Sequence, residues 1–215
     1  MPVHSSRYRW PRPRWLVQDW KGPIRDPLDL LRATFLVGAV VALALGDVDS
    51  AVRLGLTFGL VILARQISLP RPFDLAFLVG MALQGWGNVF GLFDTFSWYD
   101  KVVHFVLPMA VAPVFYILLI RLDAVPDLAA DTDGRHHAGI VLITASLGFA
   151  FGAIYEIYEY IAVHAFSAGL AIGYADTIGD LADDLVGSLL GGVFLVIWAR
   201  FGWATSRRVS VAADP

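Results

Sequence analysis

The apolar residues of this chain fall into six long blocks, and this feature constrains its fold more than any other. Each block approaches the length of about 17–25 residues that a helix needs to cross a bilayer. Charged residues make up only 16% of the chain, whereas about 25% is usual for a soluble domain. Because lipid offers no partner for backbone polar groups, such blocks must be helical. We therefore predict an all-α, polytopic transmembrane helix bundle.

The expected spans cover residues 28–46, 51–67, 73–93, 99–120, 138–163 and 178–200. Asp26, followed by Pro27, and Asp74 are predicted to cap the first and third of these helices. Gln84 and Asn88, four residues apart in the outer half of the third span, could line the same cavity as the acids described below. Hydrogen bonding between helices is the favoured interpretation of both. The chain is long enough for one bundle and not for two domains.

The arginines set the direction of the bundle through the positive-inside rule. A cytoplasmic N-terminus places seven arginines beyond the basic N-terminal segment on the cytoplasmic side, namely Arg65, Arg71, Arg121, Arg135, Arg200, Arg207 and Arg208. The opposite side then receives only Arg53 and Lys101. We therefore predict that both termini are cytoplasmic.

The chain is expected to have three segments. Residues 1–27 mix basic residues with tyrosine, tryptophan and proline. This composition suits a segment on an anionic membrane surface, and equally a solvated basic tail. Residues 28–203 are predicted to form the transmembrane domain, and residues 204–215 a short cytoplasmic tail.

Pairs of glycines recur at four-residue spacing, which lets helix backbones approach closely in lipid. The pairs are Gly55 and Gly59, Gly87 and Gly91, Gly148 and Gly152, and Gly187 and Gly191. They predict a tightly packed bundle.

Carboxylates and one histidine gather where three spans reach the outer side. Asp100 and His104 are four residues apart at the start of the fourth span, so they share one helical face. Glu156 and Glu159 share a face near the end of the fifth span. The sixth span begins with an acidic stripe made of Asp176, Asp180, Asp183 and Asp184. The tyrosines near this side are interpreted as aromatic belt residues and not as site residues; they are Tyr99, Tyr155, Tyr158, Tyr160 and Tyr174.

The charges of this cluster are not balanced by the sequence around it. An unpaired carboxylate inside a span costs about 2–3 kcal/mol, and the two bases on that side are too few to neutralise these acids. A bound divalent metal supplies the missing charge, and one imidazole with several carboxylates suits zinc, manganese, iron or magnesium. The predicted metal ligands are Asp100, His104, Glu156, Glu159, Asp180 and Asp184; the predicted substrate-binding residues are Lys101, Asp176 and Asp183.

A structural role is the alternative for some of these acids. Ser97 with Asp100, and Thr177 with Asp180, fit the spacing of a capping box, so both acids could cap helix starts. Capping does not account for His104 or for the deeper carboxylates. The sequence has no phosphate-binding glycine loop, nucleophile elbow or His-Glu-x-x-His motif, so no catalytic residue is assigned. The chain has no cysteine, which excludes thiolate ligands.

The motifs of the cluster resemble those of the VanZ-like family of small bacterial membrane proteins, and more closely a YjdF-type set of inner-membrane proteins. These motifs are Asp100-Lys101-x-x-His104, Glu156, and Asp180-x-x-x-Asp184-x-x-Gly187-x-x-x-Gly191. The resemblance covers about residues 73–198 and implies a multi-pass protein of the bacterial plasma membrane with a role in the cell envelope.

The chain departs from the VanZ-like pattern at three places. Glu159 stands where that pattern tends to have glutamine, and Asp184 where it tends to have asparagine. The arginine that precedes the last helix in that pattern has no match. The more acidic site favours binding of a cation over binding of an anionic lipid head group.

The first functional hypothesis is a metal-dependent hydrolase or transferase that acts on a lipid-linked substrate. A cation- or proton-coupled transporter is the alternative, although the inner halves of the last three spans are almost wholly apolar. A structural or accessory membrane protein is the third possibility. Membrane lipids are the expected surroundings, and no feature indicates a nucleic-acid partner. The sequence alone does not decide whether the protein is an enzyme.

Overall fold

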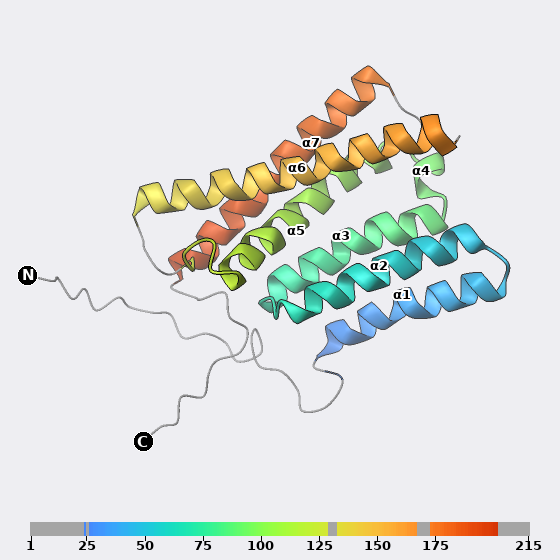
Figure 1. Ribbon diagram of the computed structural model, residues 1–215, viewed down its shortest axis with the longest axis horizontal. Coiled ribbons are helices and arrows are strands. Elements are labelled where there is room, and N and C mark those ends of the chain that lie inside the picture. Colours follow the sequence, from blue (N-terminus) through green and yellow to red (C-terminus); the bar gives the residue numbers. More distant parts are fainter. Residues whose placement is uncertain (1–23, 25, 129–132, 167–172, 202–215) are drawn as a thin grey trace, which may run out of the picture.

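A computed structural model gives the structure of residues 24, 26–128, 133–166 and 173–201. Within these ranges the chain forms six long helices and one short helix, and no strand (Figure 1). They are α1 (Pro27–Ala44), α2 (Val48–Gln66), α3 (Arg71–Val89), α4 (Leu92–Thr95), α5 (Tyr99–Arg121), α6 (Gly134–Phe166) and α7 (Tyr174–Arg200). The predicted all-helical bundle is confirmed, and each expected span corresponds to one long helix.

Four of the described helices, α1, α5, α6 and α7, are long and apolar enough to cross a membrane by length and composition. The other two long helices reach a similar length but are less apolar, and α2 carries Asp49, Arg53 and Arg65. On these criteria the structure supports four of the six predicted spans. Charged side chains within α2 must therefore find partners inside the protein or at its rim.

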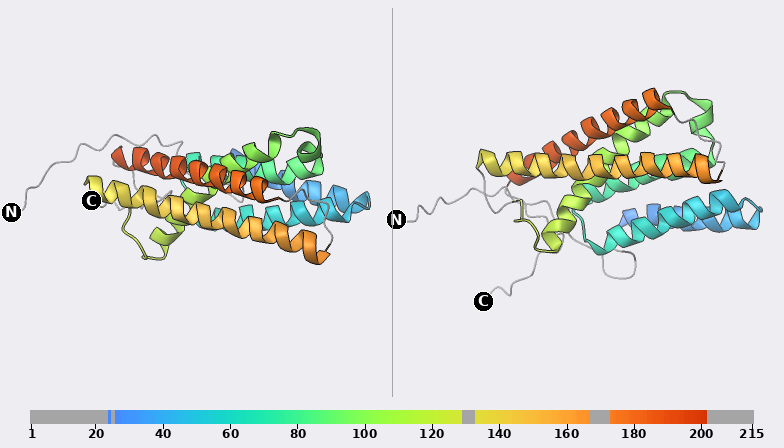
Figure 2. Two further views of the ribbon diagram at one scale, coloured as in Figure 1. Left: turned by 90° about the horizontal axis from the view of Figure 1, so that it is seen from above. Right: turned by 45° about the horizontal axis from the view of Figure 1, so that its top comes forward.

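The helix α5 lies at the centre of the bundle. It packs against α3 on one side and against α6 and α7 on the other, while α1 and α2 pair with each other next to α3. Figure 2 shows this order, with the α1–α2 pair and the α6–α7 pair on opposite sides. Leu107, Val111 and Ile117 of α5 are all buried. The central position of α5 explains why it is the most buried of the four candidate spans.

Glycines allow α6 and α7 to approach their neighbours closely. A Cβ atom on Gly187 would overlap the backbone of Phe105 on α5. A Cβ atom on Gly152 of α6 would overlap the carboxylate of Asp184 on α7. The other members of these two pairs, Gly148 and Gly191, are equally crowded. The predicted close packing is confirmed for both pairs.

The same prediction is wrong for Gly55 and Gly59 of α2, where an added Cβ atom would meet no atom within 4 Å. The two glycines of the third pair have different surroundings. Gly87 packs against the ring of Tyr99, whereas Gly91 has a φ of 64° and lies in the turn before α4. Four-residue spacing thus identified glycines that share a face, but it could not show whether a helix packs on that face.

The helices alternate in direction, so the bundle has two chemically different ends. We call the end where α1 and α3 begin and α2 ends the arginine end. We call the end where α5 and α7 begin and α6 ends the acidic end. In Figure 1 the arginine end lies to the left and the acidic end to the right. Almost all of the predicted segment 1–27, and the whole predicted tail 204–215, lie outside the described residues, so those assignments stay predictions.

A network of salt bridges joins α1, α2 and α3 at the arginine end. Arg32 of α1 is 2% exposed and pairs with Asp74 of α3 and, at 3.0 Å, with Asp29. Arg65 of α2 binds the same Asp29 through contacts of 2.8 and 2.9 Å. Arg65, a charged residue within α2, therefore has a partner inside the protein, whereas no pattern in the sequence pointed to Arg32 or Asp29.

The two predicted helix caps have different outcomes. Asp26 accepts a hydrogen bond of 2.8 Å from the backbone N–H of Leu28, and Pro27 is the first helical residue, so this cap is confirmed. Asp74 is not a cap, because Pro70 occupies the N-cap position of α3 and Asp74 faces Arg32 instead. A buried arginine is a stronger partner for a carboxylate than backbone N–H groups at a helix start.

Candidate functional site

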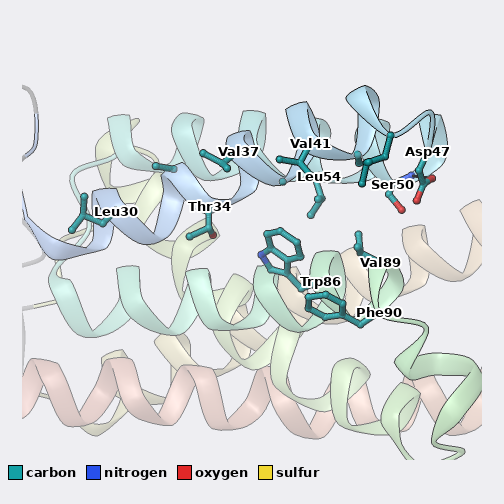
Figure 3. Close-up of a pocket in the computed structure, with 14 residues that line it drawn as sticks. Leu30, Thr34, Val37, Val41, Asp47, Ser50, Leu54, Trp86, Val89 and Phe90 are labelled. Atoms are coloured by element: carbon teal, nitrogen blue, oxygen red, sulfur yellow. Dashed lines mark hydrogen bonds between the residues drawn. The ribbon is translucent and has the colours of Figure 1, made fainter.

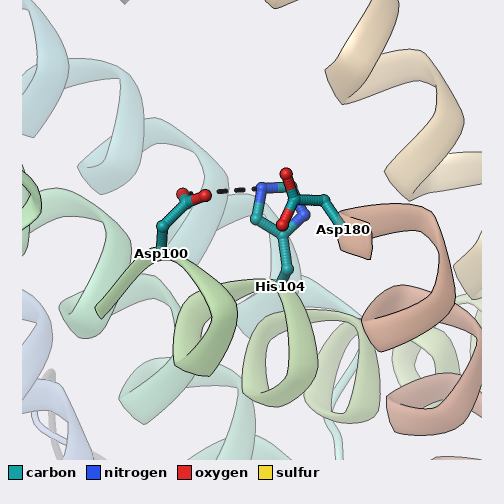
Figure 4. Close-up of side chains that lie close together, drawn as sticks. All are labelled: Asp100, His104 and Asp180. Atoms are coloured by element: carbon teal, nitrogen blue, oxygen red, sulfur yellow. Dashed lines mark ion pairs between the residues drawn. The ribbon is translucent and has the colours of Figure 1, made fainter. Parts of the chain in front are cut away.

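Three helices bring polar side chains together at the acidic end. Asp100 and His104 come from the first two turns of α5, Glu156 from the last third of α6, and Asp180 and Asp184 from the first half of α7. Figure 4 shows the carboxylates of Asp100 and Asp180 turned toward the His104 ring. We call these five residues the acidic cluster. Helices α5, α6 and α7 pack together closely because of the glycines described above, and this packing positions the cluster.

The Nε2 atom of His104 faces several carboxylates. It lies 3.7 Å from Oδ1 of Asp100 and 3.8 Å from Oε1 of Glu156. One donor atom each from Asp100, His104 and Asp180 lie within 4.8 Å of one another. Ligand distances of divalent cations are about 2.0–2.6 Å, so a single ion can contact all three atoms after small side-chain adjustments.

The other nitrogen of the imidazole is bound to Asp184. Oδ1 of Asp184 lies 3.1 Å from Nδ1 of His104, and both side chains are buried. A carboxylate on one nitrogen fixes the orientation of a histidine ring and leaves the other nitrogen free to act as a ligand. Gly152 makes this arrangement possible, since any side chain there would displace Asp184. Asp184 therefore positions His104.

Several buried oxygens of the acidic cluster have no hydrogen-bond donor among the described residues. They are Oε1 of Glu156, Oδ1 of Asp180 and Oδ2 of Asp184. A buried acceptor without a donor costs about 1–3 kcal/mol, and more when it is charged. The chemistry of the donor set therefore fits a cation or protons.

Nearby bases do not balance these acids. Arg53 pairs with Asp49 at 2.6 Å, so it is engaged on α2. Lys101 is exposed, and no lysine or arginine of the described residues makes an ion pair with a carboxylate of the acidic cluster. Four carboxylates thus surround one imidazole.

Helix capping does not explain the two acids for which it was the alternative. The N-cap of α5 is Trp98 and that of α7 is Gly173, and neither helix has a side-chain cap. The helix α7 begins at Tyr174, so Asp180 lies in its second turn. The capping interpretation of Asp100 and Asp180 is therefore wrong for this structure.

The remaining predicted site residues are placed differently. Glu159 is half-buried one turn beyond Glu156, and Asp183 is half-buried beside Asp184. Asp176 and Lys101 are exposed. The donor atoms that come within 4.8 Å of each other belong to Asp100, His104 and Asp180, so three of the six predicted metal ligands, Glu156, Glu159 and Asp184, lie outside this set. The roles assigned to all of these residues stay predictions.

Two further residues lie beside the acidic cluster, namely Tyr155, which the sequence did not indicate, and Gln84, which was a possible cavity residue and does line the small cavity next to His104. The ring of Tyr155 packs edge-on against His104, with centroids 5.7 Å apart. The hydroxyl of Tyr155 accepts a hydrogen bond of 2.7 Å from Gln84 of α3. The predicted hydrogen bond between helices is confirmed for Gln84, but it is wrong for Asn88, which donates to the carbonyl of Gln84 within α3 at 2.8 Å. The belt interpretation is wrong for Tyr155 and for Tyr99, which is buried and donates to the carbonyl of Leu83. Tyr155 lies three residues after Gly152 of a predicted packing pair, and this spacing on one helical face was the available signal.

A comparison with protein families supports the membrane assignment. A family model described as "Predicted membrane protein (DUF2238)" matches residues 28–201. The match includes all of the acidic cluster and nearly every described helical residue. No curated protein and no solved structure matches the chain.

Proposed function

The chain belongs to the DUF2238 family of predicted membrane proteins. We propose that the protein binds a divalent cation in the acidic cluster and acts there as a hydrolase or transferase on a lipid-linked substrate. One observation carries this proposal: four carboxylates, with buried oxygens that lack donors, surround a single histidine. Ionisable groups inside membrane helices are costly, and they usually mark functional sites.

The residues of the acidic cluster divide into three roles. Asp100, Asp180 and Nε2 of His104 hold the cation, since their donor atoms converge. Asp184 holds the imidazole by its other nitrogen. Glu156 has an unpartnered oxygen 3.8 Å from Nε2 and takes up a proton from the attacking nucleophile. One nitrogen and several carboxylate oxygens suit zinc, manganese, iron or magnesium.

A bound divalent cation would supply Lewis acidity toward a phosphoryl or carbonyl oxygen of the substrate. The chain itself supplies orientation and a base. Tyr155 and Gln84 form a wall beside His104, and a carboxylate such as Glu156 is the usual type of base for such a reaction.

The finer placement of the protein is also part of the proposal. We place it as a multi-pass protein in the bacterial plasma membrane with both termini in the cytoplasm, so that the acidic end faces outward. The motifs of residues 73–198 support a relationship to VanZ-like and YjdF-type proteins. The arginine excess at the arginine end supports this direction.

A cation- or proton-coupled transporter is the second candidate, and two buried hydroxyls favour it. Ser188 lies one turn beyond Asp184 on α7, and Thr144 lies on the facing side of α6. Neither hydroxyl has a hydrogen-bond partner among the described residues. They extend the polar groups toward the arginine end, but Leu195 and Val196 beyond them are buried and apolar. Cation flux into proteoliposomes, abolished by Asp184→Asn, would favour this candidate over the enzyme.

The metal content of the purified protein tests the first proposal. We expect about one divalent ion per chain in the wild type and in Asp183→Asn, and loss of the ion in Asp180→Asn. Asp183 is the matched control, because it is an aspartate on the same helix outside the converging donor set. Folded wild-type protein that binds no divalent cation in a titration would contradict the proposal.

A further inference from the structure

An apolar groove of about 470 Å³ opens between α2, α3, α5 and α6. Buried side chains such as Met81 and Val114 form its floor. Leu60 and Leu63 form a rim on α2 and are 52% and 66% exposed. The volume lies in the range of about 300–1,000 Å³ that is usual for small-molecule pockets.

The groove opens at the side of the bundle and is closed at the arginine end. The helix α6 packs mainly on α5 and α7, so it leaves the adjoining faces of α2 and α3 uncovered. At the arginine end, Arg121 lines the groove and its Nε atom donates to the carbonyl of Ile67 at 3.2 Å. A chain-like ligand in the surrounding membrane can therefore enter from the side.

The other end of the groove reaches the acidic cluster. Phe151 of α6 lines both the groove and a small cavity of about 10 Å³ beside His104. That cavity, large enough for about one water molecule, is also lined by Gln84 and Tyr155. Tyr155 lies one turn beyond Phe151, and its hydrogen bond with Gln84 joins α6 to α3 on the cluster side of the groove. The apolar groove and the polar site thus meet at one aromatic side chain.

We propose that this groove binds an aliphatic chain of the membrane lipid whose head group reacts at the acidic cluster. The identity of the head group as substrate rests on the function proposed above, whereas binding of the chain does not. A chain that leaves the bilayer for the groove gains no hydrophobic free energy, so the groove must select it by packing. Binding of the chain would favour the reaction by position, because a bound chain holds the head group close to His104 and Glu156.

A second apolar groove provides an internal control. It has a volume of about 590 Å³ and lies between α1, α2 and α3 (Figure 3). Trp86 and Phe90 line it from α3, and Val37 and Val41 from α1. No residue of the acidic cluster lines this control groove. It is larger than the first groove, so size alone would favour it.

Photolabelling distinguishes the two grooves. The full-length protein is purified in detergent until only tightly held lipid remains, and it is then incorporated into lipid nanodiscs. The nanodiscs contain a small fraction of phosphatidylglycerol with a diazirine at the end of one acyl chain. After irradiation, peptide mass spectrometry locates the labelled residues. We expect several-fold more label at Phe115 and Leu118 than at Val37 and Val41. Equal labelling, as lipid around the whole protein would give, would overturn the inference.

Two matched substitutions sharpen the result. Leu118→Trp places an indole in the first groove, and Val37→Trp places one in the control groove. Leu118→Trp should reduce the label at Phe115 several-fold, and Val37→Trp should leave it unchanged. The reverse pattern would contradict the inference. If Leu118→Trp aggregates, Leu63→Trp on the exposed rim replaces it.

Metal content measured on the same samples separates this inference from the proposed function. A bound cation with equal labelling of the two grooves would reject the lipid groove alone. Selective labelling without a cation would support the groove and reject the metal site. Leu118→Trp protein that keeps its cation but loses its label would support both.

Discussion

The two ends of the bundle differ in whether their charged side chains are balanced by groups of opposite charge. The arginine end has equal numbers of both signs in its salt bridges, which involve Arg32, Arg65 and Arg71 with Asp26, Asp29 and Asp74. The acidic end places Asp100, Glu156, Asp180 and Asp184 around His104. A network with equal numbers of positive and negative groups stabilises the helices that it joins, so a structural role is enough to explain it. A structural role does not explain the acidic cluster, because mutual repulsion of its carboxylates opposes folding.

This difference indicates where to look for function in a helix bundle of this kind. Buried charge alone is a weak criterion, since Arg32 is as deeply buried as Asp180. The useful criterion is buried charge that nearby groups leave uncompensated. Removal of one charged group should therefore lower the free energy of unfolding at the arginine end and raise it at the acidic end. The following predictions test this contrast.

The largest effect is expected from Arg32→Met at the arginine end. The substitution leaves Asp74 buried without the arginine that it pairs with, and a broken buried ion pair costs about 3–5 kcal/mol. Thermal unfolding in detergent should show a lower midpoint than the wild type. The double substitution Arg32→Met with Asp74→Leu should recover part of the loss, because it removes both charges. An unchanged midpoint for the single variant would show that the network does not support the fold.

The opposite sign is expected for Asp180→Asn in metal-free protein. This change removes a negative charge from a crowded group and should raise the free energy of unfolding by about 1–3 kcal/mol. Chelator-treated protein is used, and Asp183→Asn is the control. If Asp180→Asn destabilises the metal-free protein as strongly as Arg32→Met does, the contrast between the two ends is false.

An effect of similar size, on binding and not on folding, is expected for Asp184→Asn, which should weaken cation binding about 10–100-fold without abolishing it. The reason is that Asp184 orients His104 and does not belong to the converging donor set. Isothermal titration with Zn²⁺ or Mn²⁺ measures the change, and NMR of the imidazole nitrogens reports whether the tautomer shifts. Complete loss of binding would instead make Asp184 a ligand.

The smallest effect is expected at the exposed pair of α2. Asp49 and Arg53 form a salt bridge of 2.6 Å, but their side chains are 73% and 38% exposed. Such pairs contribute about 0.2–1 kcal/mol, so Asp49→Asn should shift the unfolding midpoint little. A shift as large as that of Arg32→Met would mean that burial does not separate the two kinds of pair.

The helices and the composition of the acidic cluster follow from local patterns of residues. The fourth predicted span, residues 99–120, matches α5 at Tyr99–Arg121. Asp100 and His104 face one way because four residues make about one helical turn. Hydrophobic blocks and helical periodicity are local properties, so they can be read directly from the order of residues.

How the helical faces meet is visible only once the helices are packed together. Arg32 and Asp74 are 42 residues apart and pair because α1 packs beside α3. Glu156 lies 3.8 Å from Nε2 of His104, whereas Glu159, on the same predicted face, is half-buried one turn further along α6. Asp184 binds Nδ1, which leaves Nε2 for the other acids. The physical reason is that the rotation and crossing of packed helices depend on side-chain shape along the whole interface, and no local pattern contains that information.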